Sequence, residues 1–548
     1  MTLCIEENNM NRKQKILLAS LIAGHFVILI LGVFYRFVDG DEGGYLVVSK
    51  EVINGRIPIL DINAHNQPLL YYFYGLWMKI FGFTIPAARS LSAATVFIVG
   101  LLIFYWVYKF SKKYWAAVIS YILFIINLTF YKVNISVKPF PLSNFFIFAS
   151  FVILTSRYLS GRLTENATLF FSGLLLGMAM GIRLIFILPV MFVIWLIVVM
   201  YRENLTVNEI AKKAAIFCIG VIIPLLPSIW IFIKEPLRAY AIWGGAYAQV
   251  YFGKGNNPDF AADVLKDMKH DMMIKGLIDV VKVPDTVFLL LLVLISTVLL
   301  IRKWRQGMDK IEFNIYLLIW MIFGGIIWIY SNMYANYLGY VNQLTLFAVL
   351  LSLPVVEKIT NAAAPKKLIV YVSIFLATII GLSYLHFQKR LKTSIFYMFN
   401  SKEQIITPEF VNDISENVIK KLTKEGDVVL DTWGVFVFTS NRRPLNGYEY
   451  PTDQALFWKL MPNRENARKY LYISETELLM MLEKKEIPLL VLGDPKALNQ
   501  LVLDERLAKS DDIDIVLNHA NRYYYLYRKY FVKPTNAWLL IYLPEKPL

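Results

Sequence analysis

The amino-acid sequence predicts a multi-pass α-helical membrane protein of about eleven spans, with a large first external loop and a C-terminal extracytoplasmic α/β domain. Of its 548 residues, 57% are hydrophobic, and the mean hydropathy of +0.50 is too high for a soluble protein of this length. Apolar runs recur along residues 16–385, each near the length of about 20 residues that a helix needs to cross a bilayer. From Ile406 onward the composition becomes that of a soluble domain.

The apolar runs give the candidate spans. In order they are 16–35, 85–108, 114–131, 139–157, 168–182, 184–201, 214–233, 284–301, 313–331, 337–356 and 368–385. The pair 168–182 and 184–201 has an alternative, because Gly181-Ile182-Arg183 could also kink one long helix. Losing one span would reverse the orientation of everything that follows it.

Basic residues indicate the orientation. With the tail 1–15 in the cytoplasm, every cytoplasmic loop is basic, as the positive-inside rule requires. These residues are Lys109, Lys112, Lys113, Arg157, Arg162, Arg202, Lys212, Lys213, Arg302, Lys303, Arg305, Lys358, Lys366 and Lys367. Lys132 and Lys138 fall on the opposite side. An odd number of spans then places the domain 386–548 outside the cytoplasm of a cell-membrane protein.

The same bias accounts for the formal net charge of +15. We therefore expect membrane lipids as partners and no nucleic acid. The cysteines Cys4 and Cys218 are too few for a disulfide framework or a thiolate metal site.

The segment after Ile406 predicts a small α/β domain. We expect short buried strands in GDVVLDTWGVFVF (426–438) and IPLLVLGD (487–494), a helix in TELLMMLEKKE (476–486), and a two-stranded hairpin in IDIVLNHANRYYYLYRK (513–529). Neither a GxGxxG after a strand nor a GxxxxGK[ST] occurs, so nucleotide binding is not predicted.

The first external loop, 36–84, is the candidate catalytic segment of the domain 16–385. Its carboxylates cannot lie in hydrocarbon, so the loop lies at a membrane edge. They are Asp39, Asp41, Glu42 and Asp61. A second external loop, 234–283, ends in an amphipathic stretch, 262–283, that fits either an interfacial helix or an ordinary solvated one.

Asp41 and Glu42 are the first candidates for catalysis. Gly43 and Gly44 follow them and let the backbone bend to bring a carboxylate close to a substrate. Desolvation at an apolar boundary raises a carboxylate's pKa, which suits a general base near neutral pH. The alternative is structural: the two acids could start a helix from Gly44 to Ile53.

The loop also carries a longer pattern: Asp41-Glu42, Gly44-Tyr45, EVINGRIPILD, QPLLYYFYGLWMKIFG and AARSLSA. Over about 60 residues it resembles the polyprenyl-phosphate-sugar-dependent glycosyltransferases of the membrane-embedded C superfamily. Most similar are bacterial relatives of the protein O-mannosyltransferases and of the aminoarabinose transferase that modifies lipid A. SGLLLGMAMGIRLIFILP and NYLGYVNQLTLFAVLLSLP resemble two of the family's spans, and an external α/β tail also fits it.

The resemblance implies an inverting enzyme that moves a monosaccharide from a polyprenyl-phosphate sugar to an envelope protein, glycolipid or polysaccharide on the extracytoplasmic face. It implies Asp41 as general base, with Glu42 as an alternative or as its orienting partner. The leaving phosphate needs a cation, and the candidates are Arg89, Arg183 and Lys138. Each could instead snorkel to the headgroups, which is the interpretation we favour for Lys138.

Two departures from the family pattern affect phosphate binding. His65-Asn66-Gln67-Pro68 stands where the family has Lys-Pro-Pro, so a cation is missing unless His65 replaces it. Tyr334-Ala335-Asn336-Tyr337 stands where it has Arg-x-x-His-Tyr.

Further residues are expected to contact the lipid phosphate or the acceptor. They are Asp61, His65, Gln67, Tyr45, Tyr71 and Tyr337. Asp61 could equally start a turn, and the aromatic set Tyr71, Tyr72, Tyr74 and Trp77 could be an interfacial belt or a lipid groove. No cofactor is expected. A metal at Asp39, Asp41 and Asp61 has only the acids in its favour.

Three other functions remain open. A polymerase or ligase would use lipid-linked oligosaccharides on a diphosphate donor. A secondary transporter would show charged or broken helices in two matching halves, which we do not find. A non-catalytic membrane protein would tolerate loss of Asp41.

Overall fold

The computed structural model describes residues 10–38, 40–160, 164–185, 187–245, 284–331, 338–362, 378, 406–450, 464–493, 511–532 and 537–546. Asp39, Tyr337, the candidate span 368–385 and the stretch 262–283 lie outside these residues, so what was predicted for them is not tested.

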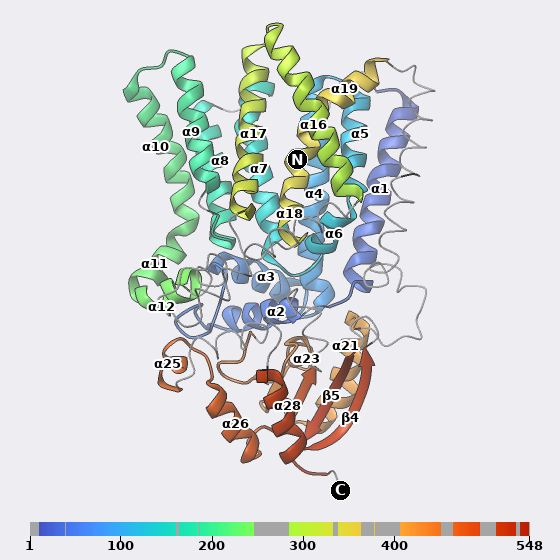
Figure 1. The fold of residues 1–548 in the computed structure, drawn as a ribbon, viewed down its shortest axis with the longest axis vertical. Coiled ribbons are helices and arrows are strands. Elements are labelled where there is room, and N and C mark those ends of the chain that lie inside the picture. Colours follow the sequence, from blue (N-terminus) through green and yellow to red (C-terminus); the bar gives the residue numbers. More distant parts are fainter. Residues whose placement is uncertain are drawn as a thin grey trace.

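Within the described residues, seven helices are long and apolar enough to cross a membrane, counting α10, η2 and α11 as one. They are α1 (Arg12–Tyr35), α4 (Ile85–Ser111), α7 (Pro139–Ser160), α8 (Glu165–Ile182), α10 (Val207–Ile222) continued through η2 (Ile223–Leu225) into α11 (Leu226–Lys234), α16 (Pro284–Arg305) and α17 (Lys310–Ser331). Figure 1 shows these helices standing together in the upper part of the molecule. The chain is a multi-pass helical membrane protein.

Three more predicted spans correspond to shorter or bent helices. The helices α18 (Leu338–Leu351) and α19 (Leu353–Ala362) form one apolar pair bent by 40°. Shorter apolar helices are α5 (Tyr114–Ile125) and α9 (Ile187–Arg202). Since α8 ends at Ile182 and α9 begins at Ile187, the segment around Arg183 separates two helices and is not a kink inside one.

Glycines bring α8 and α10 into close contact. A Cβ atom on Gly173 would lie 2.2 Å from the carbonyl oxygen of Phe217, and one on Gly177 would lie 2.2 Å from that of Val221. Gly220 meets the Phe170 carbonyl in the same way, at 2.4 Å. Small residues let membrane helices approach through their backbones, so this glycine-rich span is explained by helix packing.

The predicted first external loop is mostly helical. It contains α2 (Gly40–Ile53) and α3 (Pro68–Phe81), which lie between the spans and the C-terminal domain (Figure 1). Helix α2 begins four residues earlier than predicted, so both acids lie in its first turn. Nearby are the short helices α6 (Leu128–Asn134) and α12 (Pro236–Tyr240) and the π-helix η3 (Ala241–Gly245).

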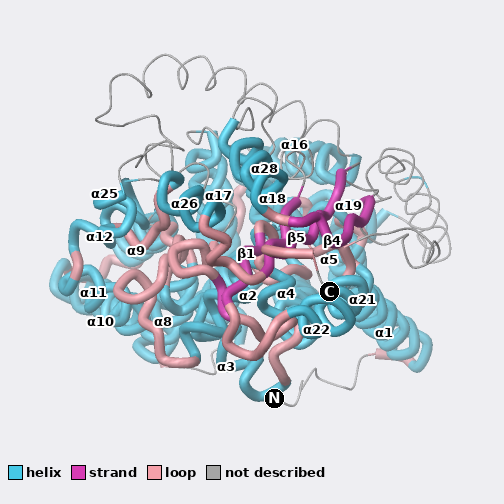
Figure 2. The backbone as a smooth tube through the Cα atoms, turned by 90° about the horizontal axis from the view of Figure 1, so that it is seen from below, coloured by secondary structure: helices cyan, strands magenta, loops and turns pink. Residues whose placement is uncertain are grey.

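The C-terminal domain is built on a five-stranded sheet of order β2-β1-β3-β5-β4. Strand β1 (Val428–Asp431) runs parallel to β2 (Arg443–Pro444) and β3 (Leu489–Gly493). Strand β5 (Ala537–Leu543) is antiparallel to β3 and to β4 (Tyr525–Val532). Figure 2 shows the strands gathered in one region of an otherwise helical chain. The described helices are α21 (Pro408–Ile414), η6 (Ser415–Ile419), α22 (Lys420–Leu422), α23 (Val435–Thr439), α25 (Arg464–Lys469), α26 (Glu475–Glu483) and α28 (Asp511–Tyr523).

The strands β1 and β3 and the helix α26 confirm three of the predicted elements. Two other expectations were wrong. The end of GDVVLDTWGVFVF is the helix α23, because Gly434 adopts a φ of 74° and the Asp431 carboxylate accepts hydrogen bonds from the helix's first N–H groups. The first half of the expected hairpin is α28, which buries Val516 and Ala520 on one face at helical spacing.

Candidate active site

The first turn of α2 directs its two acids to different places. Glu42 points into the protein and its side chain is 0% exposed. Arg89 of α4, also 0% exposed, donates two hydrogen bonds to it, from Nε to Oε1 at 2.7 Å and from Nη2 to Oε2 at 2.7 Å. Such a bidentate pair is strong and fixes the geometry of both side chains.

Further hydrogen bonds surround this pair. Arg89 also donates to the carbonyls of Val33, Arg36 and Phe37, at 3.2, 2.8 and 3.0 Å. The Val137 N–H donates to Glu42 Oε1 at 3.0 Å. The pair thereby ties the end of α1, the start of α2, α4 and the segment before α7. These contacts favour an orienting role for Glu42, and Arg89 is fully buried among its hydrogen-bond partners.

Asp41 lies on the other side of the turn, and its side chain is 48% exposed. Lys138 Nζ lies 3.2 Å from Asp41 Oδ2, although 97 positions separate the two residues in the chain. The Lys138 side chain is 17% exposed, so it does not snorkel as we favoured from the sequence. The structure thus joins one predicted base and one predicted cation.

Arg183 lies near the same helix start. It follows α8, and its guanidinium stands 4.7 Å from the centre of the Phe140 ring. Phe140 is two residues beyond Lys138, at the start of α7. Two of the three predicted cations therefore approach the beginning of α7.

His65 does not replace the missing cation. It is buried, with its ring 4.7 Å from that of Tyr450 and its Nε2 3.4 Å from the Tyr472 hydroxyl. Burial lowers the pKa of His65 to about 3, so the imidazole is neutral at physiological pH. It contributes polar contacts and no positive charge.

Asp61 closes a turn, and the hydroxyls of Tyr45 and Tyr71 both bond to Asn66. Asp61 Oδ2 accepts from the Ile57 N–H at 2.8 Å, which fits a turn. Asn66 donates from its backbone to the Tyr71 hydroxyl at 3.1 Å and from its side chain to that of Tyr45 at 3.0 Å.

Two members of the aromatic set are inside the protein. Tyr71 and Tyr74 are fully buried, so an interfacial belt is wrong for these two rings. Gln67 is also buried; it precedes α3, and its Oε1 has no hydrogen-bond partner among the described residues.

The described residues contain no group of three or more His, Cys, Asp or Glu side chains that could hold a metal ion. Asp39 lies outside them. Asp41 is paired with Lys138 and Asp61 closes its own turn.

Sequence reasoning missed an amide network deeper in the membrane domain. Asn342 Oδ1 accepts from Asn134 Nδ2 at 3.0 Å and from Asn144 Nδ2 at 2.9 Å, and all three side chains are buried. The network joins α6, α7 and α18 just beyond the Lys138 segment. The signal in the sequence that could have revealed this network is the presence of asparagines in apolar runs, because amides in hydrocarbon need hydrogen-bond partners.

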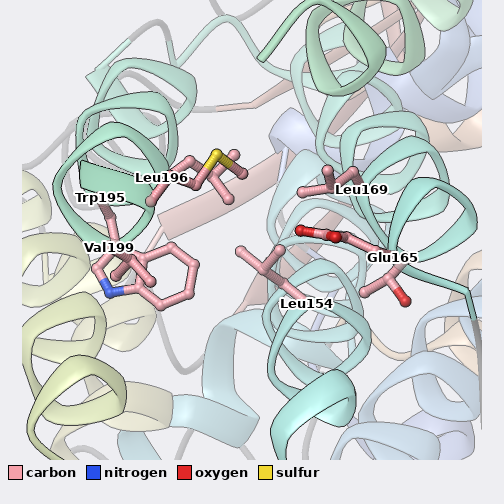
Figure 3. Close-up of a pocket in the computed structure, with 8 residues that line it drawn as sticks. Leu154, Glu165, Leu169, Trp195, Leu196 and Val199 are labelled. Carbon is pink, nitrogen blue, oxygen red and sulfur yellow. The ribbon is translucent and has the colours of Figure 1, made fainter. Parts of the chain in front are cut away.

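A narrow crevice between α7, α8 and α9 lies apart from Asp41. It is lined by Leu154, Glu165, Thr168, Leu169, Trp195, Leu196, Val199 and Met200 (Figure 3). It has room for roughly one water molecule, and Glu165 pairs with Lys213 at its edge, at 2.6 Å. A crevice of this size does not hold a sugar or a lipid.

No protein-family model matches the sequence, and no curated protein matches it. The structure is similar to a crystal structure of ArnT from Cupriavidus metallidurans bound to undecaprenyl phosphate, with a TM-score of 0.58 and 12% identity over 96% of this chain and 97% of that one. The apo form of the same protein gives a TM-score of 0.56 with the same identity and coverage. A partial likeness (TM-score 0.34, 17% identity, 46% of this chain and 38% of the other) is found to the S. cerevisiae protein O-mannosyltransferase Pmt1-Pmt2 complex bound to the sugar donor. Over nearly its whole length, this chain has the fold of ArnT.

Proposed function

We propose that the protein is an inverting glycosyltransferase that moves a monosaccharide from a polyprenyl-phosphate sugar to an envelope acceptor on the extracytoplasmic face. The observation that carries this proposal is the half-exposed Asp41, 3.2 Å from Lys138, in the first turn of a helix at the edge of the membrane domain. A base and a cation side by side are what attack on an anomeric carbon beside a phosphate requires.

The reaction assigns one task to each residue. Asp41 accepts the proton of the acceptor hydroxyl while that oxygen bonds to the anomeric carbon. The bond from the anomeric carbon to the phosphate oxygen breaks, and polyprenyl phosphate leaves with the electron pair. Lys138, with Arg183 nearby, offsets the charge that develops on the phosphate. Base catalysis of this kind contributes about 10²–10⁴-fold.

The fold supports the choice of donor. ArnT, whose fold this chain shares, has been crystallised with undecaprenyl phosphate. The basic loops favour a cytoplasmic N-terminus, with α2 and the C-terminal domain on the opposite face, where such a donor would be used.

The test is the pool of lipid-linked sugars in cells that lack the protein, analysed by mass spectrometry. We expect one polyprenyl-phosphate monosaccharide to accumulate, and the wild-type protein to remove it. The Asp41→Asn variant should leave it in place. Glu51→Gln, a change of a partly exposed acid on the same helix, is the matched control and should behave as the wild type.

Two outcomes would contradict the proposal. An unchanged lipid pool in all strains would exclude a polyprenyl-phosphate donor. Accumulation of a diphosphate-linked oligosaccharide would indicate a polymerase or ligase instead.

A further inference from the structure

The C-terminal domain rests directly on the first turn of α2. A Cβ atom on Gly43 would lie 1.9 Å from the Trp433 carbonyl oxygen and 2.8 Å from the Val435 nitrogen. One on Gly44 would lie 2.4 Å from the Tyr450 ring. These contacts leave no room for a side chain, so both glycines are required for the domain to dock here.

The segment before α2 is held by the same domain. The buried Trp433 indole donates from Nε1 to the Val38 carbonyl at 3.0 Å, and the Val38 N–H donates to the Ile406 carbonyl at 2.7 Å. Both backbone groups of Val38 are therefore bonded to the C-terminal segment. Val38 lies three residues before Asp41, so these bonds fix the backbone from which Asp41 projects.

The contacting turn, residues 432–435, is held by hydrogen bonds of its own domain, and we call it the docking turn. The Asp431 carboxylate accepts from the N–H groups of Trp433, Phe436 and Val437 at 2.8, 2.8 and 3.0 Å. The Thr432 N–H donates to the Val491 carbonyl on β3 at 3.0 Å. A turn anchored to the sheet in this way can transmit the position of the domain to α2.

Helix geometry explains why one turn serves several contacts. Successive side chains on an α-helix point about 100° apart. Asp41 accordingly faces Lys138, Glu42 faces Arg89, Gly43 faces Trp433 and Gly44 faces Tyr450.

We propose that the docking turn is a positioning element for Asp41, so that the C-terminal domain is part of the catalytic apparatus. This inference rests on the proposed function. The docking turn holds the first turn of α2 in the rotation that brings Asp41 to Lys138. Displacing the docking turn would rotate or fray the first turn of α2. Misplacement of a catalytic group by about 1 Å can cost 10²-fold in rate.

The experiment compares full-length wild type with Trp433→Phe, which removes one indole N–H, and Gly43→Ala, which adds one methyl group. Trp538→Phe, on β5 and away from α2, is the control. Hydrogen exchange of the peptide 36–53 is measured in vesicles. We expect faster exchange there in both variants, with α4 and α8 unchanged, and no change in the control.

Turnover is measured with a lipid extract from cells lacking the protein. We expect kcat to fall about 10- to 100-fold in Gly43→Ala and less in Trp433→Phe, while KM for the extract stays within about twofold. If exchange is faster in the two variants but no form of the protein, not even the wild type, shows turnover, the proposed function alone is rejected. Unchanged exchange at 36–53, or a loss confined to KM, would overturn the positioning role. If Gly43→Ala fails to fold, Trp433→Phe decides.

Discussion

Asp41 and Glu42 are neighbours with the same charge, yet they lie in opposite environments. Glu42 is fully buried and bonded to Arg89 and to the Val137 N–H, while Asp41 is half exposed and pairs with Lys138 across a more open contact. One step of about 100° around a helix produces this difference. The comparison teaches that the rotation of one helix decides which of two neighbouring acids is buried in an ion pair and which stays half exposed.

The largest effect is expected from Asp41→Asn. The variant keeps the shape of the side chain but cannot accept a proton, so the transfer rate should fall about 10²–10⁴-fold. The midpoint of thermal unfolding should change little, because the acid is half exposed. Equal loss of stability and activity would break the distinction between the two acids.

Arg89→Met tests the buried acid. It leaves Glu42 charged and without its main cation, and breaking a buried pair in this way costs about 3–5 kcal/mol. We expect a clearly lower midpoint of thermal unfolding in detergent. The double variant Glu42→Gln/Arg89→Met removes both charges and should recover part of the loss; a double variant less stable than Arg89→Met would argue against the pair as the cause.

Asp431 adds a third case to the comparison, a buried acid that accepts hydrogen bonds from backbone N–H groups. Burial raises the pKa of Asp431 to about 6, while those hydrogen bonds lower it. A raised folded-state pKa gives stability that is complete below about pH 4 and is lost as the pH rises through about 6, by about 2–3 kcal/mol.

The check is the difference in unfolding midpoint between wild type and Asp431→Asn from pH 4 to 8. The advantage of wild type should shrink as the pH rises. Tyr448, which interacts electrostatically with Asp431, is present in both proteins. A difference that grows with pH would mean that the N–H groups outweigh burial.

The smallest effect is expected at a surface pair, Lys420 and Glu416, which lie 2.5 Å apart with side chains 34% and 47% exposed. Pairs of this kind contribute about 0–1 kcal/mol. Lys420→Ala should leave the unfolding midpoint almost unchanged and the transfer rate unaffected. A loss of stability comparable with that of Arg89→Met would show that burial does not determine how much an ion pair contributes to stability.

The helices of the membrane domain were predictable because length and hydrophobicity alone define a span. The break between α8 and α9 and the strands β1 and β3 could also be predicted from the sequence. The helix α23 was not, since its start depends on the Asp431 carboxylate and on the φ of Gly434. Local apolar runs cannot distinguish a short buried strand from a short buried helix.

At the site, the sequence identified Asp41 and Lys138 as chemical groups but could not pair them. Which acid faces the core depends on how α2 is rotated against α4, and that is tertiary information. Gly43 and Gly44 were interpreted as aids to backbone bending near a substrate, whereas they make room for Trp433 and Tyr450. Contacts between residues so far apart in sequence leave no local pattern.

The asparagine network has a consequence for biosynthesis. Asn342 is synthesised about 200 residues after Asn134 and Asn144, and its amide enters the bilayer at a cost unless these earlier partners are already in place. Asn134 on α6 and Asn144 on α7 are thus the earlier-synthesised donors that satisfy the carbonyl oxygen of Asn342 on α18.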